Sequence, residues 1–276
     1  MEIYQSVVLG LLQGLTEFLP VSSSGHLVLG QNFFGITEPV LSFDITLHMG
    51  TLAAVVLVFY QDIRAMVLSL LNLVKSVAAG KASMAMIRDN RDVRLAALII
   101  VGSVPTAFIG LFLKQHVETS LSSLSVVGLM LMGTGTFLWF TRNIRGNTIT
   151  IDGFGFKKAV FIGICQGLAV IPGVSRSGAT IAAGLFTGIE RETAARFSFL
   201  LSLPAIVGAE LLSVKESLAT GFYLDKATLY GTFVSFVVGF FALKVLLKIV
   251  KNGRLHLFAP YCWAAGVLAV AAGLAG

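Results

Sequence analysis

The sequence predicts an all-α, multi-pass integral membrane protein with about six transmembrane helices and two re-entrant helical hairpins, arranged as an inverted-topology repeat. Three observations predict this fold. Hydrophobic residues make up 56% of the 276 residues and charged residues only 12%, whereas a soluble domain carries about 25% charged residues. Apolar stretches of bilayer-spanning length recur along the chain. Two similar segments, one in each half, interrupt this pattern with Pro, Gly and Ser.

The whole chain, residues 1–276, is predicted to form a single membrane domain, because no stretch is polar enough for a separate soluble domain. The formal net charge of +6 does not indicate nucleic acid as a partner, since an excess of Lys and Arg in a membrane protein usually sets its orientation. Cys165 and Cys262 lie in apolar segments and predict no disulfide framework. No Lys or Arg precedes Arg64, so the basic region of a signal peptide is missing.

Six segments are apolar and long enough to cross the membrane once. They lie at about 43–60, 95–113, 125–141, 197–213, 227–247 and 257–275. Two other apolar regions, 1–34 and 159–187, contain Pro20 and Pro172, which cannot continue a helix because proline lacks the N–H and clashes with the preceding turn. Each region is therefore predicted to form a helix, a break and a second helix, as in a re-entrant hairpin.

The basic residues predict the orientation. If each hairpin enters and leaves by the same face, one side of the membrane holds the loops and helix ends at 61–94, 142–158, 188–196 and 244–254. These segments contain 16 of the 20 basic residues, the opposite side contains three, and Arg176 lies in a break. The basic side is therefore predicted to be cytoplasmic, and both termini are expected to face outward.

The two broken regions align with each other without a gap. "QGLTEFLPVSSSG" from Gln13 matches "QGLAVIPGVSRSG" from Gln166. Each half, about 1–141 and 159–276, then holds one hairpin and three spans, and because three is odd the halves have opposite orientations. In such a repeat the special site is expected near the midplane, where the broken helices meet.

The expected pocket between the two hairpins suits an anion. A new helix begins after each break, so free N–H groups and the positive end of the helix dipole face the pocket and favour phosphate. Arg176 adds a planar fork of donors for phosphate oxygens, and it is expected to pair with Glu17, a ligand or both, because a buried unpaired guanidinium is costly. Gly25 and Gly178 are expected to let the backbone approach a ligand closely.

Candidate catalytic groups gather in the first break. Glu17 is either a functional carboxylate or half of a structural ion pair, and both interpretations can hold. One of Ser22, Ser23 and Ser24 can cap the following helix, so Ser23 is either a cap or a chemical group. His26, expected beside Glu17 and Ser23, is interpreted as an acid–base residue or as a satisfied polar residue.

Three ionisable residues lie outside the two breaks, within apolar segments. Asp44 and His48 lie four residues apart on one helix face. Asp44 is either a site residue or a residue of the outer interface, and His48 is a weaker candidate than Asp44. Glu210 is expected at the outer interface.

The two motifs resemble those of the bacterial undecaprenyl-diphosphatase family, the bacitracin-resistance membrane phosphatases. "QGLTEFLPVSSSGH", residues 13–26, is similar to the first family signature, and "PGVSRSGAT", residues 172–180, is similar to the second. The resemblance covers essentially the whole chain. It implies hydrolysis of undecaprenyl diphosphate to undecaprenyl phosphate and phosphate, which recycles the lipid carrier for peptidoglycan and other cell-wall polymers and confers resistance to bacitracin.

The resemblance also implies residue roles. The expected catalytic residues are Glu17, Ser23, His26 and Arg176. Ser175, Arg176, Ser177 and Thr180 are the diphosphate-binding residues that the resemblance implies, and position at the two breaks adds Ser22, Ser24, Gly25 and Gly178 to the expected set. A divalent cation, Mg²⁺ or Ca²⁺, is expected at Glu17, with Gln13 and Asp44 as weaker ligands, although Gln13 stands where some family members carry Glu.

The same resemblance places the protein in the bacterial inner membrane, with membrane lipids around it, a site that opens outward and a possible homodimer. Two mechanisms stay open at this point. In the first, Ser23 attacks the terminal phosphorus with His26 as its base. In the second, Glu17 or His26 activates a water molecule that attacks directly. A transporter or flippase of polyprenyl phosphate or another anionic lipid is the alternative function, because inverted repeats with broken helices are common in transporters.

Overall fold

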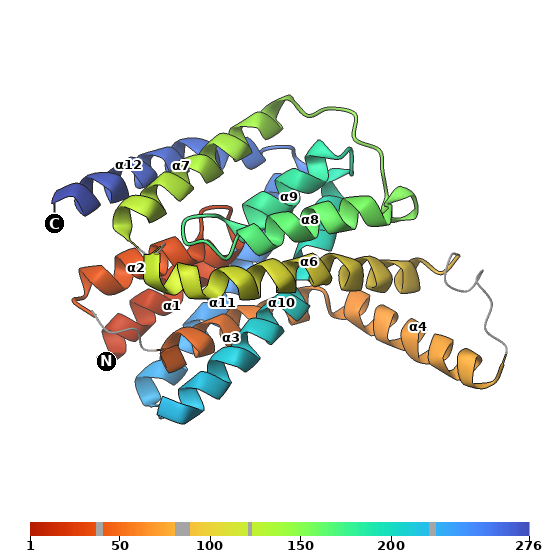
Figure 1. The fold of residues 1–276 in the computed structure, drawn as a ribbon, viewed down its shortest axis with the longest axis horizontal. Coiled ribbons are helices and arrows are strands. Elements are labelled where there is room, and N and C mark those ends of the chain that lie inside the picture. The colour runs from red at the N-terminus through yellow and green to blue at the C-terminus, as the bar shows by residue number, and fades with distance from the viewer. Residues whose placement is uncertain (37–40, 81–88, 121–122, 221–224, 276) are drawn as a thin grey trace.

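The computed structural model describes residues 1–36, 41–80, 89–120, 123–220 and 225–275. These residues form eleven α-helices and, apart from one isolated bridge between Ile149 and Ile189, no β-structure (Figure 1). The all-α prediction is therefore confirmed. The helices of the first part of the chain are α1 (Ile3–Phe18), α2 (Ser23–Phe33), α3 (Leu41–Val58), α4 (Tyr60–Ala78), α6 (Arg91–Ser120) and α7 (Leu124–Phe140). Those of the second part are α8 (Phe156–Leu168), α9 (Arg176–Phe186), α10 (Arg191–Thr220), α11 (Lys226–Lys251) and α12 (Ala259–Ala275).

Several helices are long and apolar enough to cross a membrane, so the chain is a multi-pass membrane protein. Within the described residues there are five such spans, which lie at Arg91–Leu113, Leu124–Asn143, Arg191–Lys215, Lys226–Lys251 and Leu255–Leu274. Helices α3 and α4 pass the same test together but are bent by 76° at the break between them. Counting this bent pair as one span gives the six that the sequence predicts.

The predicted loop at 61–94 is wrong in its first part, because α4 continues the chain as a helix to Ala78. Apolar side chains recur along α4 at helical spacing, and Val67, Leu71 and Val74 are exposed. Arg64 and Lys75 lie in the same segment, and this basic character predicted a loop although the apolar periodicity indicates a helix. Residues 81–88 of the same predicted loop lie outside the described residues.

Both broken regions contain the predicted pair of short helices. Helices α1 and α2 have 16 and 11 residues, and α8 and α9 have 13 and 11. Each is shorter than the about 20 residues that a membrane span requires. Pro20 lies between α1 and α2, and Pro172 lies between α8 and α9, where the fixed proline ring prevents helix continuation.

Helices from the two halves of the chain pack in matched pairs. α1 lies along α11, α8 lies along α6, and α7 pairs with α12. Gly10 of α1 meets the backbone of Gly231, and Gly163 of α8 meets that of Gly102, with no room for a Cβ atom at either contact. These contacts allow the backbones to approach closely, as small residues do between membrane helices.

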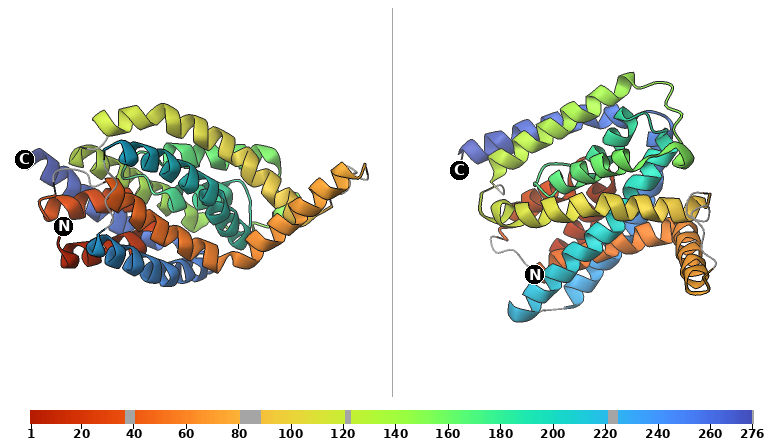
Figure 2. Two further views of the ribbon diagram at one scale, coloured as in Figure 1. Left: turned by 90° about the horizontal axis from the view of Figure 1, so that it is seen from below. Right: turned by 45° about the vertical axis from the view of Figure 1, so that its right-hand side comes forward.

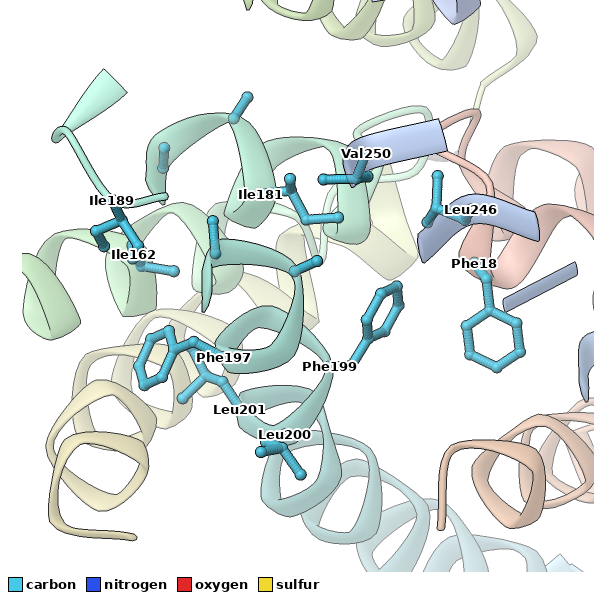
Figure 3. Packing of buried hydrophobic residues seen from close by; sticks show 14 of the residues in the cluster. Phe18, Ile162, Ile181, Ile189, Phe197, Phe199, Leu200, Leu201, Leu246 and Val250 are labelled. Carbon is cyan, nitrogen blue, oxygen red and sulfur yellow. The ribbon is translucent and has the colours of Figure 1, made fainter. Parts of the chain in front are cut away.

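The hydrophobic core lies directly beside the first break (Figure 3). The rings of Phe18 and Phe199 pack edge to face with their centroids 5.9 Å apart, and Leu246 of α11 belongs to the same buried cluster. Because Phe18 directly follows Glu17, this packing fixes the end of α1 that carries the Glu17 carboxylate.

Both chain termini lie at one end of the molecule, and α4 projects at the other end (Figures 1 and 2). Helices α6 and α10 run from the α4 end toward the end with the termini, and they spread apart as they approach it. Leu201 of α10 packs against Gly102 of α6, and beyond this contact the two helices diverge beside the site described next (Figure 1).

Candidate active site

The two helix breaks meet through matched serine caps. The Ser22 hydroxyl accepts hydrogen bonds from the N–H of Gly25 at 3.4 Å and, across the two breaks, from the N–H of Gly173 at 3.1 Å. The Ser175 hydroxyl accepts from the N–H of Gly178 at 3.1 Å. Ser22 and Ser175 are therefore the N-caps of α2 and α9, and the N-terminal ends of both helices begin beside the same junction.

Gly178 allows the second break to pack closely on the first. A Cβ atom at Gly178 would lie only 3.1 Å from the Cβ of Pro20, whereas one at Gly25 would be tight against Val127 Cγ1, at 3.2 Å. The close approach of Gly25 and Gly178 to a ligand stays a prediction. Ser22 has a φ of +69°, a conformation that residues other than glycine rarely adopt and that often occurs at functional sites.

Glu17 and Arg176 form an ion pair between the two breaks. The Glu17 side chain is only 1% exposed, whereas the Arg176 side chain is 22% exposed. The second Glu17 oxygen, Oε2, accepts hydrogen bonds from the Ser23 hydroxyl at 2.6 Å and from Gln13 Nε2 at 3.0 Å. Both carboxylate oxygens are therefore satisfied, which allows a carboxylate to be buried here. The pairing predicted for Glu17 and Arg176 is present.

A cavity of about 520 Å³ opens beside this ion pair. Its polar wall comes from both breaks and from the helices facing them: Thr16, Glu17, Ser22, Ser23, Ser24, His48, Ser103, Thr106, Gln166, Ser175, Arg176 and Glu210. Serine hydroxyls, one guanidinium and two helix N-termini thus surround one space, which is the donor arrangement that binds phosphate groups.

His48 and Glu210 belong to the cavity wall. From the sequence, His48 was expected to be only a weak site candidate, and Glu210 was expected at the outer interface. His48 Nε2 lies 3.9 Å from Glu17 Oε2, and His48 Nδ1 lies 3.9 Å from Glu210 Oε1. The other Glu210 oxygen is buried and has no hydrogen-bond partner among the described residues. The expected position of Glu210 near the outer interface stays a prediction, since the span that contains Glu210 ends at Lys215. An ionisable residue within a span is a functional candidate by default, and that rule would have identified both residues.

Thr180 and Ser177 lie behind Arg176 and do not line the cavity. The Thr180 hydroxyl donates to the backbone oxygen of Arg176 at 2.8 Å and also contacts the Ser198 hydroxyl. Ser177 lies 3.3 Å from the Ser175 hydroxyl and lines a second, very small cavity beside Arg176. These two residues therefore fix the first turn of α9, from which Arg176 projects.

His26 is hydrogen-bonded to neither Glu17 nor Ser23 among the described contacts, and it does not line the cavity. Its Nδ1 atom lies 2.8 Å from the backbone oxygen of Ser22 and its Nε2 atom lies 2.6 Å from the hydroxyl of Tyr261, on which the ring also stacks. Both ring nitrogens thus have partners away from Glu17. This geometry corresponds to the alternative in which His26 is a satisfied polar residue that positions the start of α2.

The three predicted metal ligands do not form a cluster. Asp44 is bonded to Gln31 Nε2 at 2.7 Å and does not line the cavity. Among the described residues, no group of three or more His, Cys, Asp or Glu side chains is arranged to hold a metal ion. Gln13 Oε1 is buried and has no hydrogen-bond partner among the described residues, but Gln13 does not line the cavity. Of the three predicted ligands, Glu17 is the one that lines the cavity, and one carboxylate fits a cation that takes its other ligands from phosphates and water, as Mg²⁺ commonly does.

A model of the family described as bacitracin resistance protein BacA matches residues 6–268. The chain belongs to the BacA family. The family resemblance predicted from the two motifs is therefore confirmed, and the match covers both broken regions and all the helices that line the cavity.

Curated BacA-like relatives match the chain over nearly its full length. An undecaprenyl-diphosphatase of Desulforapulum autotrophicum is 64% identical over 273 residues, which cover 99% of both chains. One from Desulfosudis oleivorans is 57% identical over 96% of this chain and 97% of its own. One from Methanosphaera stadtmanae is 41% identical over 98% of each. The chain is thus similar to whole diphosphatases and not to a fragment of a larger enzyme.

Proposed function

We propose that this protein is a membrane phosphatase that hydrolyses undecaprenyl diphosphate to undecaprenyl phosphate and phosphate, and so recycles the lipid carrier of cell-wall polymers. One observation carries the proposal: the Ser23 hydroxyl is hydrogen-bonded to a buried carboxylate, Glu17, that is also paired with Arg176. A hydroxyl, a base and an anion-binding group therefore meet in one cavity. The names of the relatives described above agree with this activity.

Binding of the diphosphate uses the two helix N-termini together with Arg176. The Arg176 side chain is partly exposed to the cavity, so its guanidinium can turn from Glu17 toward phosphate oxygens and bind them with two parallel hydrogen bonds. His48, 3.9 Å from Glu17, stays beside the carboxylate when Arg176 turns. Ser24 and Ser175 also line the cavity and supply further hydroxyl donors.

Ser23 is the nucleophile in this proposal. Its oxygen attacks the terminal phosphorus, its proton passes to Glu17 Oε2, and the bond from that phosphorus to the bridging oxygen breaks, which releases undecaprenyl phosphate. Water then attacks the phosphoserine, and Glu17 returns the proton to the Ser23 oxygen as that oxygen leaves. Glu17 replaces His26 as the base because the Ser23 hydroxyl already donates to Glu17 at 2.6 Å. Direct attack by water that Glu17 activates is the alternative.

A divalent cation, Mg²⁺ or Ca²⁺, fits next to Glu17, which lines the cavity. Glu17 would hold it together with phosphate oxygens and water, and it would neutralise part of the diphosphate charge. Gln13 stays the weaker predicted ligand, because it lies outside the cavity lining. Positioning and charge stabilisation are the main contributions to phosphoryl transfer, and the residues of this chain supply both through Arg176 and the two helix N-termini.

The membrane arrangement is also part of the proposal. The halves 1–141 and 159–276 form an inverted repeat, and both broken regions are re-entrant hairpins. The contacts Gly10–Gly231 and Gly163–Gly102 support this arrangement, because they pair the first helix of each half with a helix of the other half. The termini and the site face outward in this proposal, since 16 of the 20 basic residues lie in segments of the opposite predicted side, and both termini lie together at one end of the molecule (Figure 1). A homodimer stays a prediction.

Phosphate release in detergent tests the function. Purified protein with undecaprenyl diphosphate is expected to release phosphate, and Glu17→Gln is expected to abolish the release while the variant still folds. Detergent removes the membrane that transport requires, so hydrolysis by the parent separates a phosphatase from the transporter alternative. The absence of phosphate release from well-folded parent protein, with Mg²⁺ and with Ca²⁺, would contradict the proposal.

A further inference from the structure

One side of helix α4 is fixed to the rest of the protein. Asp62 of α4 lies 3.3 Å from Arg196 of α10, and the Ser69 hydroxyl donates to Asp92 of α6 at 3.5 Å. Met66, which lies between them on α4, is only 8% exposed. Positions 62, 66 and 69 share one side of the helix because a turn takes about 3.6 residues. This side of α4 therefore rests on α6 and α10, which determines where its other sides point.

An adjacent side of α4 carries apolar side chains that the protein leaves exposed. The four residues are Val67, Leu71, Val74 and Val77, and they are 48%, 51%, 63% and 60% exposed. They recur at intervals of three and four residues and so form one continuous strip, which we call the apolar stripe. Because a contiguous exposed apolar surface marks an interaction site, the apolar stripe requires a partner that covers it.

The direction of α4 places the apolar stripe at the surface of the bilayer. Helix α3 has 18 residues, which give about 27 Å at 1.5 Å per residue and nearly cross the hydrocarbon core. At the end of α3 the chain turns by 76° into α4. A helix that follows a nearly complete span at such an angle runs along the membrane surface. Figure 2 shows α4 at one end of the bundle, directed away from the other helices.

The exposed apolar surface of α3 continues into α4. Leu57, near the end of α3, is 52% exposed, and Tyr60, the first residue of α4, is 56% exposed. Tyr60 lies on the same side of α4 as Val67, seven positions later, which is about two helical turns. The surface that α3 presents to lipid therefore leads directly to the apolar stripe.

Basic residues border the apolar stripe. Arg64 and Lys75 are both exposed, and their eleven-position separation, about three helical turns, places them in line along one edge of the stripe. Beyond this edge lie the exposed amides of Gln61 and Asn72. Apolar, basic and polar side chains thus follow one another around α4, which is the order found in helices that lie at a membrane surface, where the cations reach the lipid headgroups.

We propose that α4 lies in the membrane surface at the end of the molecule opposite the termini and binds anionic phospholipid. The apolar stripe contacts acyl chains, and Arg64 and Lys75 contact the lipid phosphates. The bilayer is the partner because the lipid-facing surface of α3 continues into the stripe, and anionic headgroups complement the two cations at its edge. This inference goes beyond the proposed function and does not depend on hydrolysis.

Spin labels measure the depth of each side of α4. Cys165 and Cys262, the two cysteines of the chain, are replaced by Ala. Val74→Cys or Asn72→Cys is then labelled with a nitroxide in liposomes of phosphatidylcholine and phosphatidylglycerol. Oxygen, which concentrates in hydrocarbon, is expected to relax the label at position 74 more strongly than that at 72, and a water-soluble nickel complex is expected to show the opposite order.

Asn72 is the matched control because it is exposed on the same helix, two positions from Val74 and on the other side. Equal access of the two reagents at both positions would overturn the inference. A second copy of the chain or another protein on the apolar stripe would shield position 74 from oxygen and from the nickel complex, and this result would also overturn it.

The contacts with anionic headgroups have a separate test. Phosphatidylglycerol added to the protein in detergent is expected to raise Tm more than phosphatidylcholine does. Arg64→Gln/Lys75→Gln is expected to lose most of this difference. Lys215→Gln/Lys226→Gln is expected to keep it, since it makes the same change of net charge at exposed residues outside α4. Equal losses in the two double variants, or no loss in the first, would overturn the proposed headgroup contacts.

Discussion

Substitution of Arg176 separates the structural role of its ion pair with Glu17 from its role in binding phosphate. Arg176→Ala removes the partner of a carboxylate whose side chain is 1% exposed. Arg176→Lys retains a positive charge but removes the planar fork. The two variants are therefore expected to differ in stability and to share a loss of activity.

The size of each effect follows from the burial of the pair. Leaving one member of a buried ion pair unpaired lowers the free energy of unfolding by about 3–5 kcal/mol, which is the loss expected for Arg176→Ala. Arg176→Lys is expected to lose clearly less stability, because a cation still faces Glu17. A hydrogen bond to a charged group contributes about 1.5–3 kcal/mol, so loss of one phosphate contact is expected to lower kcat/KM of Arg176→Lys by roughly 10- to 100-fold.

The assay combines thermal unfolding in detergent with phosphate release from undecaprenyl diphosphate. The pair between Arg196 and Asp62 provides a control, because it is 3.3 Å long and its side chains are 32% and 24% exposed. Arg196→Lys is expected to change stability by less than about 1 kcal/mol and to leave activity unchanged. The double variant Glu17→Gln/Arg176→Ala is expected to regain stability over Arg176→Ala, since no buried charge is left unpaired, but to stay inactive.

Two results would refute this reasoning. Near-normal turnover in Arg176→Lys would show that the guanidinium fork does not bind phosphate. A double variant no more stable than Arg176→Ala would show that the stability loss does not come from an unpaired Glu17 carboxylate.

Variants of Ser23, His26 and Gln13 test the other parts of the site. Ser23→Ala is expected to lower kcat at least about 100-fold, with a smaller loss in Ser24→Ala, and 32P on Ser23 in trapped enzyme would identify the nucleophile; full activity in Ser23→Ala would exclude it. His26→Asn, whose amide can replace Nδ1 at the Ser22 carbonyl, is expected to retain more activity than His26→Ala if His26 positions α2, whereas equal losses would favour acid–base chemistry. Chelator is expected to lower activity, and Gln13→Glu is expected to lower the Mg²⁺ concentration that restores half of it; an unchanged metal dependence would exclude Gln13 as a ligand.

The helices and both breaks were predictable because each depends on local features of the sequence. Apolar length predicted the spans, and Pro20 and Pro172 predicted the breaks, since proline interrupts a helix whatever surrounds it. The kink between α3 and α4 follows no comparable residue, as Phe59 and Tyr60 are compatible with a continuous helix. The sequence therefore predicts a basic loop from residue 61, where the structure has helix α4.

The site was predictable where its members lie within the two motifs. The sequence predicts that Glu17, Ser23 and Arg176 lie close together, because the two aligned motifs indicate that the breaks meet at one pocket. His26 was predicted beside Glu17 from sequence proximity, but its partner is Tyr261 on α12. His48 and Glu210 come from helices outside both motifs, and contacts between distant helices are not readable from one sequence without their packing.

The contacts that join the two halves also build the phosphate-binding end of the site. The Ser22 hydroxyl of the first break accepts from Gly173 N–H of the second. Thr134 on α7 donates to the Gly173 carbonyl at 3.0 Å and accepts from the Ser175 N–H at 3.1 Å. The start of α9, and with it Arg176, is therefore held by groups from the other half of the chain. An isolated half would lack these bonds, so the site requires both halves of the chain.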